Sequence, residues 1–408
     1  MGVNEGSRIE LDVTGIAHGG VAVARYDGRV VFVADAIPGE RVLARVSDDR
    51  KSSFWRAETV EVLEASPDRV EHIWREAAID REPGNRAGGA EFGHIALPRQ
   101  RALKTEVLID SLRRFGKIER DVTVEAVPGD DDRGGLGWRT RVRLHVGDDG
   151  RPGPVAARSH RVIPVRSLPL AAASITESGI LSDSFPGVSS IDAIATADGG
   201  VRLVIGEQRP TPMTERVGDR EFRVDDTGFW QVHHGAAAVL TEAVQQAIDP
   251  DRFDPAAENL DLYGGVGLLA AAVADRFGPS TKIVSVESDA RAVDHASDNL
   301  AEWLGARAET GRVDRWLRER IAAGSVTGGD RATIVLDPPR AGAGGEVIRD
   351  LVTLGPAQLI YVACDPVAFA RDAGTLAAAG YELDALRAFD LFPHTHHVEA
   401  VARFVRVE

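Results

Sequence analysis

LDLYGGVGLLA, residues 260–270, joins an apolar run to a helical pattern through a glycine-rich turn. An apolar run ends near Asp261, and Gly265-x-Gly267 then opens a helical pattern. Glycines at such a turn let the backbone approach a nucleotide-like ligand closely. Glu287 ends the next apolar run, 20 residues after Gly267, where an acid typically accepts hydrogen bonds from ribose hydroxyls. The pattern predicts a nucleotide-binding βαβ unit, although it also fits an NAD site or a purely structural strand-to-helix turn.

The same rhythm continues through residues 231–408. Short β-rich runs (KIVSVES, ATIVLDPP, QLIYVACDP) end in polar residues, Gly or Pro, and Ala-rich helical stretches such as GLLAAAVADRF lie between them. Such alternation predicts an α/β fold with a doubly wound, Rossmann-like parallel sheet. Its chemistry is expected at the carboxyl ends of the strands.

Two further regions precede this domain. Residues 1–63 predict a small all-β unit, because short alternating runs surround the hairpin signal Asp27-Gly28. Five short strands favour an OB-like barrel, a fold that often binds oligonucleotides but does not by itself show function. Residues 64–230 predict an irregular connector to about residue 92, a helix over 97–115 and a β-rich central domain.

The central domain contains the stretch WRTRVRLHV, in which Arg139, Arg141 and Arg143 alternate with less polar residues. Alternation places the three guanidiniums on one face of a strand. That face is either a solvated sheet surface or a stripe that binds RNA phosphates. The sequence leaves both interpretations open.

Composition sets the outer limits. A chain of 408 residues, 43% hydrophobic and 27% charged, predicts two or three soluble domains. We find no signal peptide or membrane span, and one cysteine excludes an internal disulfide framework, so we expect a cytoplasmic protein. The net charge of −15 argues weakly against a nucleic-acid partner. However, the chain has 44 arginines and only four lysines. This excess of arginine reflects either a codon preference or a surface suited to phosphate contacts.

Three motifs carry candidate chemistry. IVLDPPR (334–340) puts the carboxylate of Asp337 at a strand end, and YVACDPVAFARD (361–372) does the same for Cys364, the only cysteine. Each motif also has a purely structural interpretation: IVLDPPR could simply end a strand, and Cys364 could be a buried core residue. DLFPHTHHVEAVARF (390–404) offers Glu399 in an apolar run, where a carboxylate has a raised pKa and suits a general base. Its histidines invite a metal, but no second ligand cluster accompanies them, so we expect none.

These motifs, in this order, resemble the RNA uracil-C5 methyltransferases, which use S-adenosylmethionine (SAM) to make 5-methyluridine in tRNA and 23S rRNA. The resemblance covers nearly the whole chain. DGRVVFVADAIPGE looks like the family's TRAM domain, an OB-like RNA-binding barrel, and YVACDPVAFARD looks like its nucleophile segment. The resemblance implies Cys364 as nucleophile and Glu399 as base. It implies that the SAM site is formed by Gln231, Tyr263, Gly265, Gly267, Glu287 and Asp337.

The family's chemistry explains these residue types. A thiolate that adds to C6 of uracil makes C5 nucleophilic, and a base must afterwards remove the C5 proton. The thiolate calls for a lowered pKa, for which Arg340 or Arg371 would supply positive charge. Arg340 is also a candidate RNA contact. The target uridine must leave its stack, so RNA is the expected partner.

The chain departs from the family in several places. Many members hold an iron–sulfur cluster through four cysteines, and here no cysteine remains beside Cys364, so we expect no cluster. Ala363 and Asp365 replace the usual Ser and Asn, and Leu268 stands where an Asn is common. The loop at 309–314 lacks a clear acid for the adenine side.

Rival functions remain. They are a catalytically silent RNA-binding protein of this fold, a base amino-group methyltransferase and an NAD-dependent dehydrogenase. Which RNA is methylated cannot be told from the sequence, and we expect a monomer.

Overall fold

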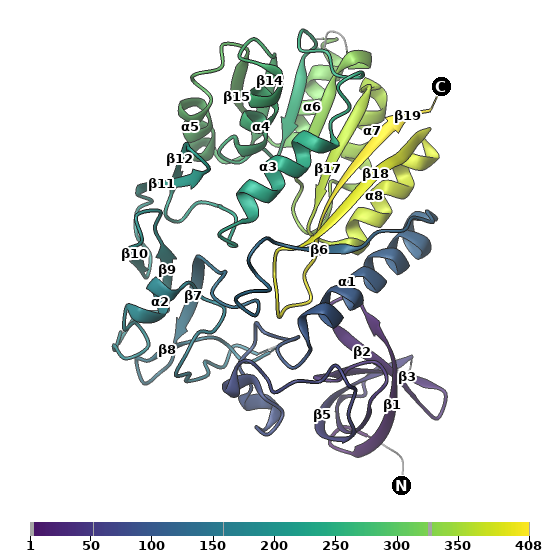
Figure 1. Ribbon diagram of the computed structural model, residues 1–408, viewed down its shortest axis with the longest axis vertical. Helices are drawn as coiled ribbons and strands as arrows, with labels where there is room; N and C mark the ends of the chain where they lie inside the picture. The colour runs from purple at the N-terminus through teal and green to yellow at the C-terminus, as the bar shows by residue number, and fades with distance from the viewer. Residues whose placement is uncertain (1–3, 52, 158, 325–328, 408) are drawn as a thin grey trace.

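The computed structural model describes residues 4–51, 53–157, 159–324 and 329–407. An N-terminal barrel and a central β-rich domain lie side by side below a large α/β domain (Figure 1). Among the described residues, no helix combines the length and apolar character that crossing a membrane requires.

The N-terminal strands close into a barrel in the order β1-β2-β3-β5-β4, as predicted. They are β1 (Arg8–Ala17), β2 (Val21–Tyr26), β3 (Arg29–Ala34), β4 (Arg41–Asp48) and β5 (Phe54–Glu64). Alternate residues of each strand fill the barrel interior, which is the period-two pattern of a half-buried strand. Asp27 and Gly28 both have positive φ (46° and 78°), which suits the tight turn between β2 and β3.

The connector holds two 3₁₀ turns, η1 (Arg75–Ala77) and η2 (Pro83–Asn85), and then α1 (Leu97–Ser111). The predicted helix over 97–115 is present, with its last turn widened to a π-helical turn at Leu112–Gly116. α1 contacts β1 of the barrel on one side and α8 (Pro366–Ala378) on the other. The helix therefore joins the barrel to the α/β domain.

The central domain has a four-stranded sheet in the order β10-β9-β7-β8 and a separate hairpin, β11-β12. Its elements are β7 (Arg141–Val146), β8 (Pro152–Gly153), α2 (Ala173–Glu177), β9 (Ser190–Ala195), β10 (Val201–Ile205), β11 (Pro212–Val217) and β12 (Arg220–Asp225). The hairpin packs on α5 (Ala290–Asn299) of the last domain. Asp225 on β12 accepts hydrogen bonds from Arg291 and lies 3.0 Å from His295 Nε2.

The α/β domain is an eight-stranded sheet in the order β15-β14-β13-β16-β17-β19-β18-β6. Its strands are β6 (Val124–Ala126), β13 (Asn259–Leu262), β14 (Ile283–Glu287), β15 (Ala306–Thr310), β16 (Thr333–Leu336), β17 (Gln358–Ala363), β18 (Tyr381–Asp390) and β19 (Glu399–Arg406). β13 to β17 are parallel, and β19 is antiparallel to both neighbours. The predicted doubly wound sheet is confirmed. The edge strand β6 comes from residues 64–230, the region assigned from sequence to the connector and central domain.

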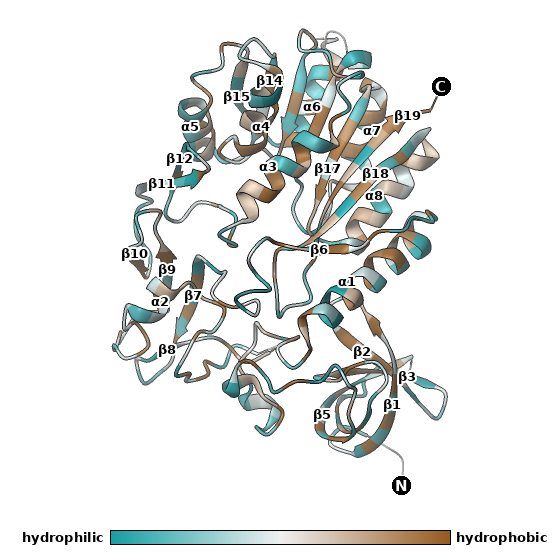
Figure 2. Ribbon diagram, viewed as in Figure 1, coloured by the Kyte–Doolittle hydropathy of each residue, from teal (hydrophilic) through white to brown (hydrophobic). Residues whose placement is uncertain are grey.

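Helices cover both faces of this sheet. They are α3 (Ala236–Ala247), α4 (Leu268–Phe277), α5, α6 (Val313–Ala322), α7 (Gly344–Leu354) and α8, with a 3₁₀ turn at Gly329–Arg331. Alternate residues of β17 enter separate cores: Tyr361 packs with α7 and α8, and Ile360 with α3 and α4. β13, β16 and β17 are therefore buried on both faces, and β16 and β17, which are mostly apolar, are largely brown in Figure 2. Polar groups gather where these strands end.

Candidate active site

Cys364 lies directly after β17, where the chain turns into α8. The Asp365 side chain caps this helix: its Oδ1 accepts hydrogen bonds from the backbone N–H groups of Val367 (3.1 Å) and Ala368 (2.8 Å). Pro366 occupies the first helical position. The cap and the proline leave the backbone little freedom, so the thiol is presented at a defined place on the edge of the sheet.

Glu399 begins β19, the antiparallel neighbour of β17. The residue before Cys364 pairs with the residue after Glu399, so one step further Cys364 and Glu399 come opposite each other. Burial raises the pKa of Glu399 well above its usual value; Asp337 raises it further and Arg340 opposes it. The predicted carboxyl with a raised pKa is confirmed. A carboxyl with a raised pKa is a stronger base than an ordinary one once it is ionised.

The environment of Cys364 raises the pKa of its thiol to about 12. Burial is the main cause, and the carboxylates of Glu399 and Asp337 add to it, while Arg340 acts in the opposite direction. The prediction of a lowered thiol pKa is therefore wrong for the free protein, because burial, together with the carboxylates, outweighs the guanidinium. Arg371 is exposed on α8, and it is not among the groups that shift this pKa.

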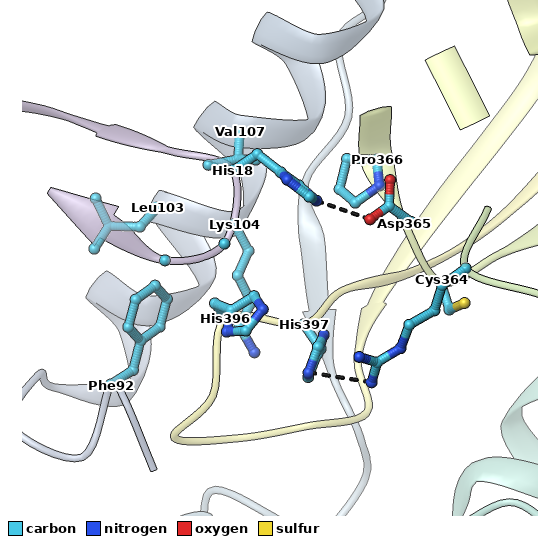
Figure 3. A pocket seen from close by; sticks show the side chains of 13 residues that line it. His18, Phe92, Leu103, Lys104, Val107, Cys364, Asp365, Pro366, His396 and His397 are labelled. Carbon is cyan, nitrogen blue, oxygen red and sulfur yellow. Dashed lines mark hydrogen bonds and ion pairs between the residues drawn. The ribbon is translucent and has the colours of Figure 1, made fainter. Parts of the chain in front are cut away.

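A cavity of about 130 Å³ opens beside Cys364 (Figure 3), and we call it the uridine side of the site. Its wall combines the barrel tip His18–Gly20, helix α1, the loop after β16 with Arg340, and the loop before β19 with His396 and His397. Arg340 Nη2 lies 3.3 Å from His397 Nε2. Segments far apart in sequence thus enclose one small space.

Helix α1 contributes Lys104 to the same wall. Its ammonium forms a buried ion pair with Asp390 (2.5 Å) at the end of β18, and it donates a hydrogen bond to the Phe392 carbonyl (3.0 Å). Although Asp390 acts the other way, burial lowers the pKa of Lys104. This pair fastens the connector helix to the α/β domain beside the cavity.

Two further cavities, of about 490 and 50 Å³, lie at the carboxyl ends of β13, β14 and β16. We call them the cofactor side. Tyr263 lines both, Glu287 lines the larger, and Gln231 and Asp337 line the smaller. The structure therefore brings these four sequence-predicted positions together.

The glycine loop forms the floor of the cofactor side. A Cβ at Gly264 would lie 2.0 Å from the Ser285 hydroxyl oxygen, so only glycine lets the loop pack there. Gly265 and Gly267 have φ values of 53° and 89°, and nothing lies within 4 Å of a Cβ at Gly265. The Gly265 N–H donates to Glu287 Oε2 at 3.3 Å. The loop thus offers open backbone to a ligand.

Carboxyl groups surround this loop. Asp261 Oδ2 accepts hydrogen bonds from the Ser285 hydroxyl (3.0 Å) and the Ala270 N–H (3.2 Å), whereas its Oδ1 has no partner within the described ranges. Burial raises the pKa of Asp261 to about 6, and burial together with Asp261 raises that of Asp337 to about 7. An acceptor-rich site of this kind fits SAM, which carries hydroxyl and ammonium donors and a positive sulfonium.

Two departures from the family pattern lie on the cofactor side. Leu268 begins α4, lines the smaller cavity and packs against the core. Asp314 lines the larger cavity, but its carboxylate is paired with Arg312 (3.0 Å). Glu309 is turned away to Arg307 and to the Trp316 ring N–H (2.8 Å).

The structure pairs two arginines of the stripe with carboxylates and leaves Arg143 exposed, which fits a solvated sheet face. Arg141 forms an ion pair with Glu215 on β11 (3.0 Å), with both side chains 11% exposed, and Arg143 forms a two-pronged pair with Asp192 on β9 (2.7 Å for each bond). Arg139 precedes β7 and donates to the Arg141 carbonyl. Neighbouring strands supply carboxylates that the alternation within one strand cannot reveal.

The histidines before β19 have separate roles. Both ring nitrogens of His394 have partners, Gln100 Nε2 at 3.0 Å and the Gly134 carbonyl at 2.8 Å. His396 and His397 face the uridine side. In the described part of the chain, no group of three or more His, Cys, Asp and Glu side chains could hold a metal ion.

Sequence reasoning missed His18 and Lys104 on the uridine side, and it considered His397 only as a possible metal ligand. His18 stands in an ordinary hairpin turn, GIAHGG, and Lys104 in a helix that otherwise looks surface-exposed. No local signal distinguishes them, because their importance comes from contacts with distant segments.

Comparison with known proteins gives matches along the whole chain. A family model described as tRNA (uracil-5-)-methyltransferase matches residues 317–406, and a TRAM-domain model matches residues 2–60. An "uncharacterized RNA methyltransferase" of Streptomyces avermitilis is 41% identical, covering 97% of this chain and 98% of that protein. The 23S rRNA (uracil(1939)-C(5))-methyltransferase RlmD of Methylococcus capsulatus is 29% identical over 98% and 97% of the two chains.

Among solved structures, the Pyrococcus abyssi tRNA (uracil-54, C5)-methyltransferase in complex with S-adenosyl-L-homocysteine superposes with a TM-score of 0.69. It shares 21% identity, and the match covers 97% of this chain and 99% of that one. At this identity the likeness establishes the fold.

Proposed function

The chain belongs to the SAM-dependent RNA (uracil-5-)-methyltransferase family, and from this premise we propose that it methylates C5 of a uridine in RNA through a covalent adduct with Cys364. The observation that carries the proposal is the position of Cys364 opposite Glu399, between the uridine side and the cofactor side. A purely structural cysteine needs neither neighbour.

In the proposed reaction, the Cys364 sulfur bonds to C6 of uracil, and the electrons of the C5–C6 double bond move to O4 as an enolate. The enolate makes C5 nucleophilic. When bound, SAM supplies the electrophilic methyl group that C5 takes up, with S-adenosylhomocysteine as by-product. Glu399 then accepts the C5 proton, the double bond re-forms, and the thiolate is expelled.

The proposed reaction requires that Cys364 and Glu399 both lose their protons. The thiol with a pKa of about 12 is protonated in the free protein, so it must lose its proton as the uridine enters. Arg340 lowers the thiol pKa and lines the same cavity, which makes it the cation that stabilises the thiolate. Glu399 must be ionised before it can take the C5 proton.

We propose that SAM binds on the cofactor side. Its contacts would come from Gln231, Tyr263, Gly265, Gly267, Glu287 and Asp337. Glu287 offers oxygens for the ribose hydroxyls. The carboxylate of Asp337 lies between this side and Cys364, since it lines the smaller cavity and raises the thiol pKa.

The proposed substrate is tRNA or 23S rRNA, with the uridine flipped out of its stack into the small cavity at a cost of a few kcal/mol. Arg340 lines the cavity beside the thiol and can offer its positive charge to the RNA there. The TRAM barrel offers further RNA contacts. We propose a monomer, because one chain supplies every described wall of the uridine side.

The test is mass spectrometry of nucleosides from tRNA and rRNA of a deletion strain, complemented with wild-type or Cys364→Ala protein. We expect 5-methyluridine to be missing from one RNA and restored only by the wild type. SAM affinity measured by calorimetry should be equal for both proteins. Restoration by Cys364→Ala, or no change in 5-methyluridine on deletion, would favour a catalytically silent RNA-binding protein.

A further inference from the structure

The tip of the β1–β2 hairpin reaches from the barrel into the wall beside Cys364 (Figure 3). His18 at this tip is 347 positions away from Asp365 in the sequence, yet its Nε2 lies 2.8 Å from Asp365 Oδ2. The side chains are 46% and 21% exposed, so the pair lies at the mouth of the cavity. Asp365 directly follows the candidate nucleophile.

Asp365 divides its two oxygens between two tasks. Oδ1 caps α8 through Val367 and Ala368, and Oδ2 binds His18. A side chain held at both oxygens cannot rotate without breaking one of these contacts. His18 therefore completes the fixation of the turn that carries Cys364, and only a carboxylate offers a second acceptor here, since the Asn usual in the family offers an N–H.

The hairpin tip is held on its other side as well. Gly20 has a φ of 73°, and a Cβ there would lie 2.4 Å from His396 Cβ and 3.1 Å from the Phe92 ring. The tip is thus wedged between the nucleophile turn and the loop that precedes Glu399. Movement of the barrel relative to the sheet would shift both.

The pair also affects the charge beside the thiol. Next to burial, Glu399 and Asp337, Asp365 raises the pKa of Cys364. The hydrogen bond with Asp365 raises the pKa of His18 despite partial burial. When it is protonated, His18 offsets one negative charge near the sulfur. The other cations lining this cavity are Lys104, already paired with Asp390, and Arg340.

Resting on the proposed role of Cys364, we propose that His18 is a positioning residue of the methyl transfer. The barrel uses it to hold Asp365, and through Asp365 the nucleophile, and to balance the carboxylate's charge beside the thiol. This contact keeps the barrel, and any RNA bound to it, in a fixed position relative to the sulfur of Cys364.

The first test measures thiol reactivity in the free protein. Because Cys364 is the only cysteine, its alkylation by iodoacetamide at pH 7 needs no SAM or RNA and reports on this site alone. We expect His18→Ala to react several-fold more slowly than wild type, because Asp365 loses its partner. Asp365→Asn, which keeps the helix cap, should react faster, and the double variant should match Asp365→Asn.

The second test measures adduct formation at saturating SAM with RNA that carries 5-fluorouridine, whose C5 has no proton to remove, so the adduct persists. We expect His18→Ala to form the adduct about tenfold more slowly, the size of one charge-assisted hydrogen bond. RNA and SAM affinities should stay within twofold of wild type. His18→Gln keeps an N–H donor and should recover most of the rate. His160→Ala, an exposed histidine of the central domain, is the matched control.

The outcomes separate the two proposals. If Cys364→Ala forms the adduct, or if the wild type forms none, the proposed function is wrong. The alkylation rates still decide the role of His18 in that case. Wild-type rates for His18→Ala in both tests overturn the positioning role, as does a loss confined to RNA affinity. If His18→Ala does not fold, His18→Gln and Asp365→Asn carry the test, and alkylation of Asp365→Asn at the wild-type rate overturns it.

Discussion

The cofactor side and the uridine side lie next to each other but are built differently. The cofactor side comes from residues 229–347 and lies within one βαβ arrangement, at the carboxyl ends of parallel strands. The uridine side needs the barrel tip, the connector helix and two loops of the last domain. The first is built almost entirely by one domain, whereas the second exists only when the barrel, the connector helix and the last domain are assembled.

This contrast suggests a division of labour. Cofactor binding requires a local backbone conformation, which a few glycines and strand-end carboxylates provide. Placing a thiol, a base and a cation around a flipped base requires rigid contacts between distant segments, such as the Lys104–Asp390 and His18–Asp365 pairs. Changes on one side should therefore leave binding at the other side intact.

The largest effect that separates the two sides is expected for Glu399→Gln. The amide cannot take the C5 proton, so the turnover rate should fall by about 10²–10⁴-fold. The covalent adduct should accumulate on unmodified uridine RNA, visible on denaturing gels, while SAM affinity stays unchanged. Glu382→Gln, the same exchange at an exposed position of β18, is the control. A Glu399→Gln enzyme with full turnover would exclude this residue as the base.

On the cofactor side, Gly264→Ala should weaken SAM binding tenfold or more in calorimetry and lower the unfolding temperature. Its Cβ would overlap the Ser285 hydroxyl (2.0 Å) and crowd Asp261 (2.7 Å). Gly265→Ala meets open space and pays only for a left-handed backbone, about 1–2 kcal/mol. Equal unfolding temperatures for the two variants would show that the packing at Gly264 does not constrain the loop.

The carboxyl cluster between the two sides predicts a pH effect on stability. The pKa of Asp337 is raised to about 7, against about 4 in an unfolded chain. Between these values the folded state keeps a proton that the unfolded state has lost, so stability falls as the pH rises. Asp337→Asn should remove that loss: its unfolding temperature should match wild type near pH 4 and exceed it by several degrees at pH 8.

The control for this experiment is Asp148→Asn, at an exposed carboxylate of the central domain. The unfolding temperature of this variant should differ from that of wild type by the same amount at pH 4 and at pH 8. If Asp337→Asn also differs by the same amount at both, the carboxyl of Asp337 has no raised pKa in the folded protein.

The smallest effect is expected away from both sides. Arg143 is 64% exposed and paired with Asp192, and such pairs typically contribute less than about 1 kcal/mol. Arg143→Ala should therefore change stability by less than that, and RNA affinity by less than threefold at physiological salt. Arg340→Ala, beside the thiol, should slow adduct formation far more. A large loss of RNA affinity in Arg143→Ala would restore part of the predicted phosphate stripe.

Much of the fold could be predicted from sequence because its signals are local. Asp27-Gly28 marks a hairpin, the glycines at 264–267 mark a strand-to-helix turn, and apolar runs mark strands buried on both faces. Cys364 and Glu399 could be proposed from sequence for the same reason, since each stands at a strand end in a segment that resembles the family's motifs. The thiol pKa could not, because it depends first on burial and then on Glu399, Asp337 and Asp365, all of which the tertiary fold sets.

The barrel, the doubly wound sheet and the candidate nucleophile follow from the amino-acid sequence, because strand periodicity, turn chemistry and motif spacing are short-range properties. The ion pairs of Arg141 and Arg143, the addition of β6 to the sheet and the contact between His18 and Asp365 emerge only in the folded chain. These features depend on which distant strands become neighbours. That choice is made by burying apolar faces throughout the chain, and no single stretch of residues records it.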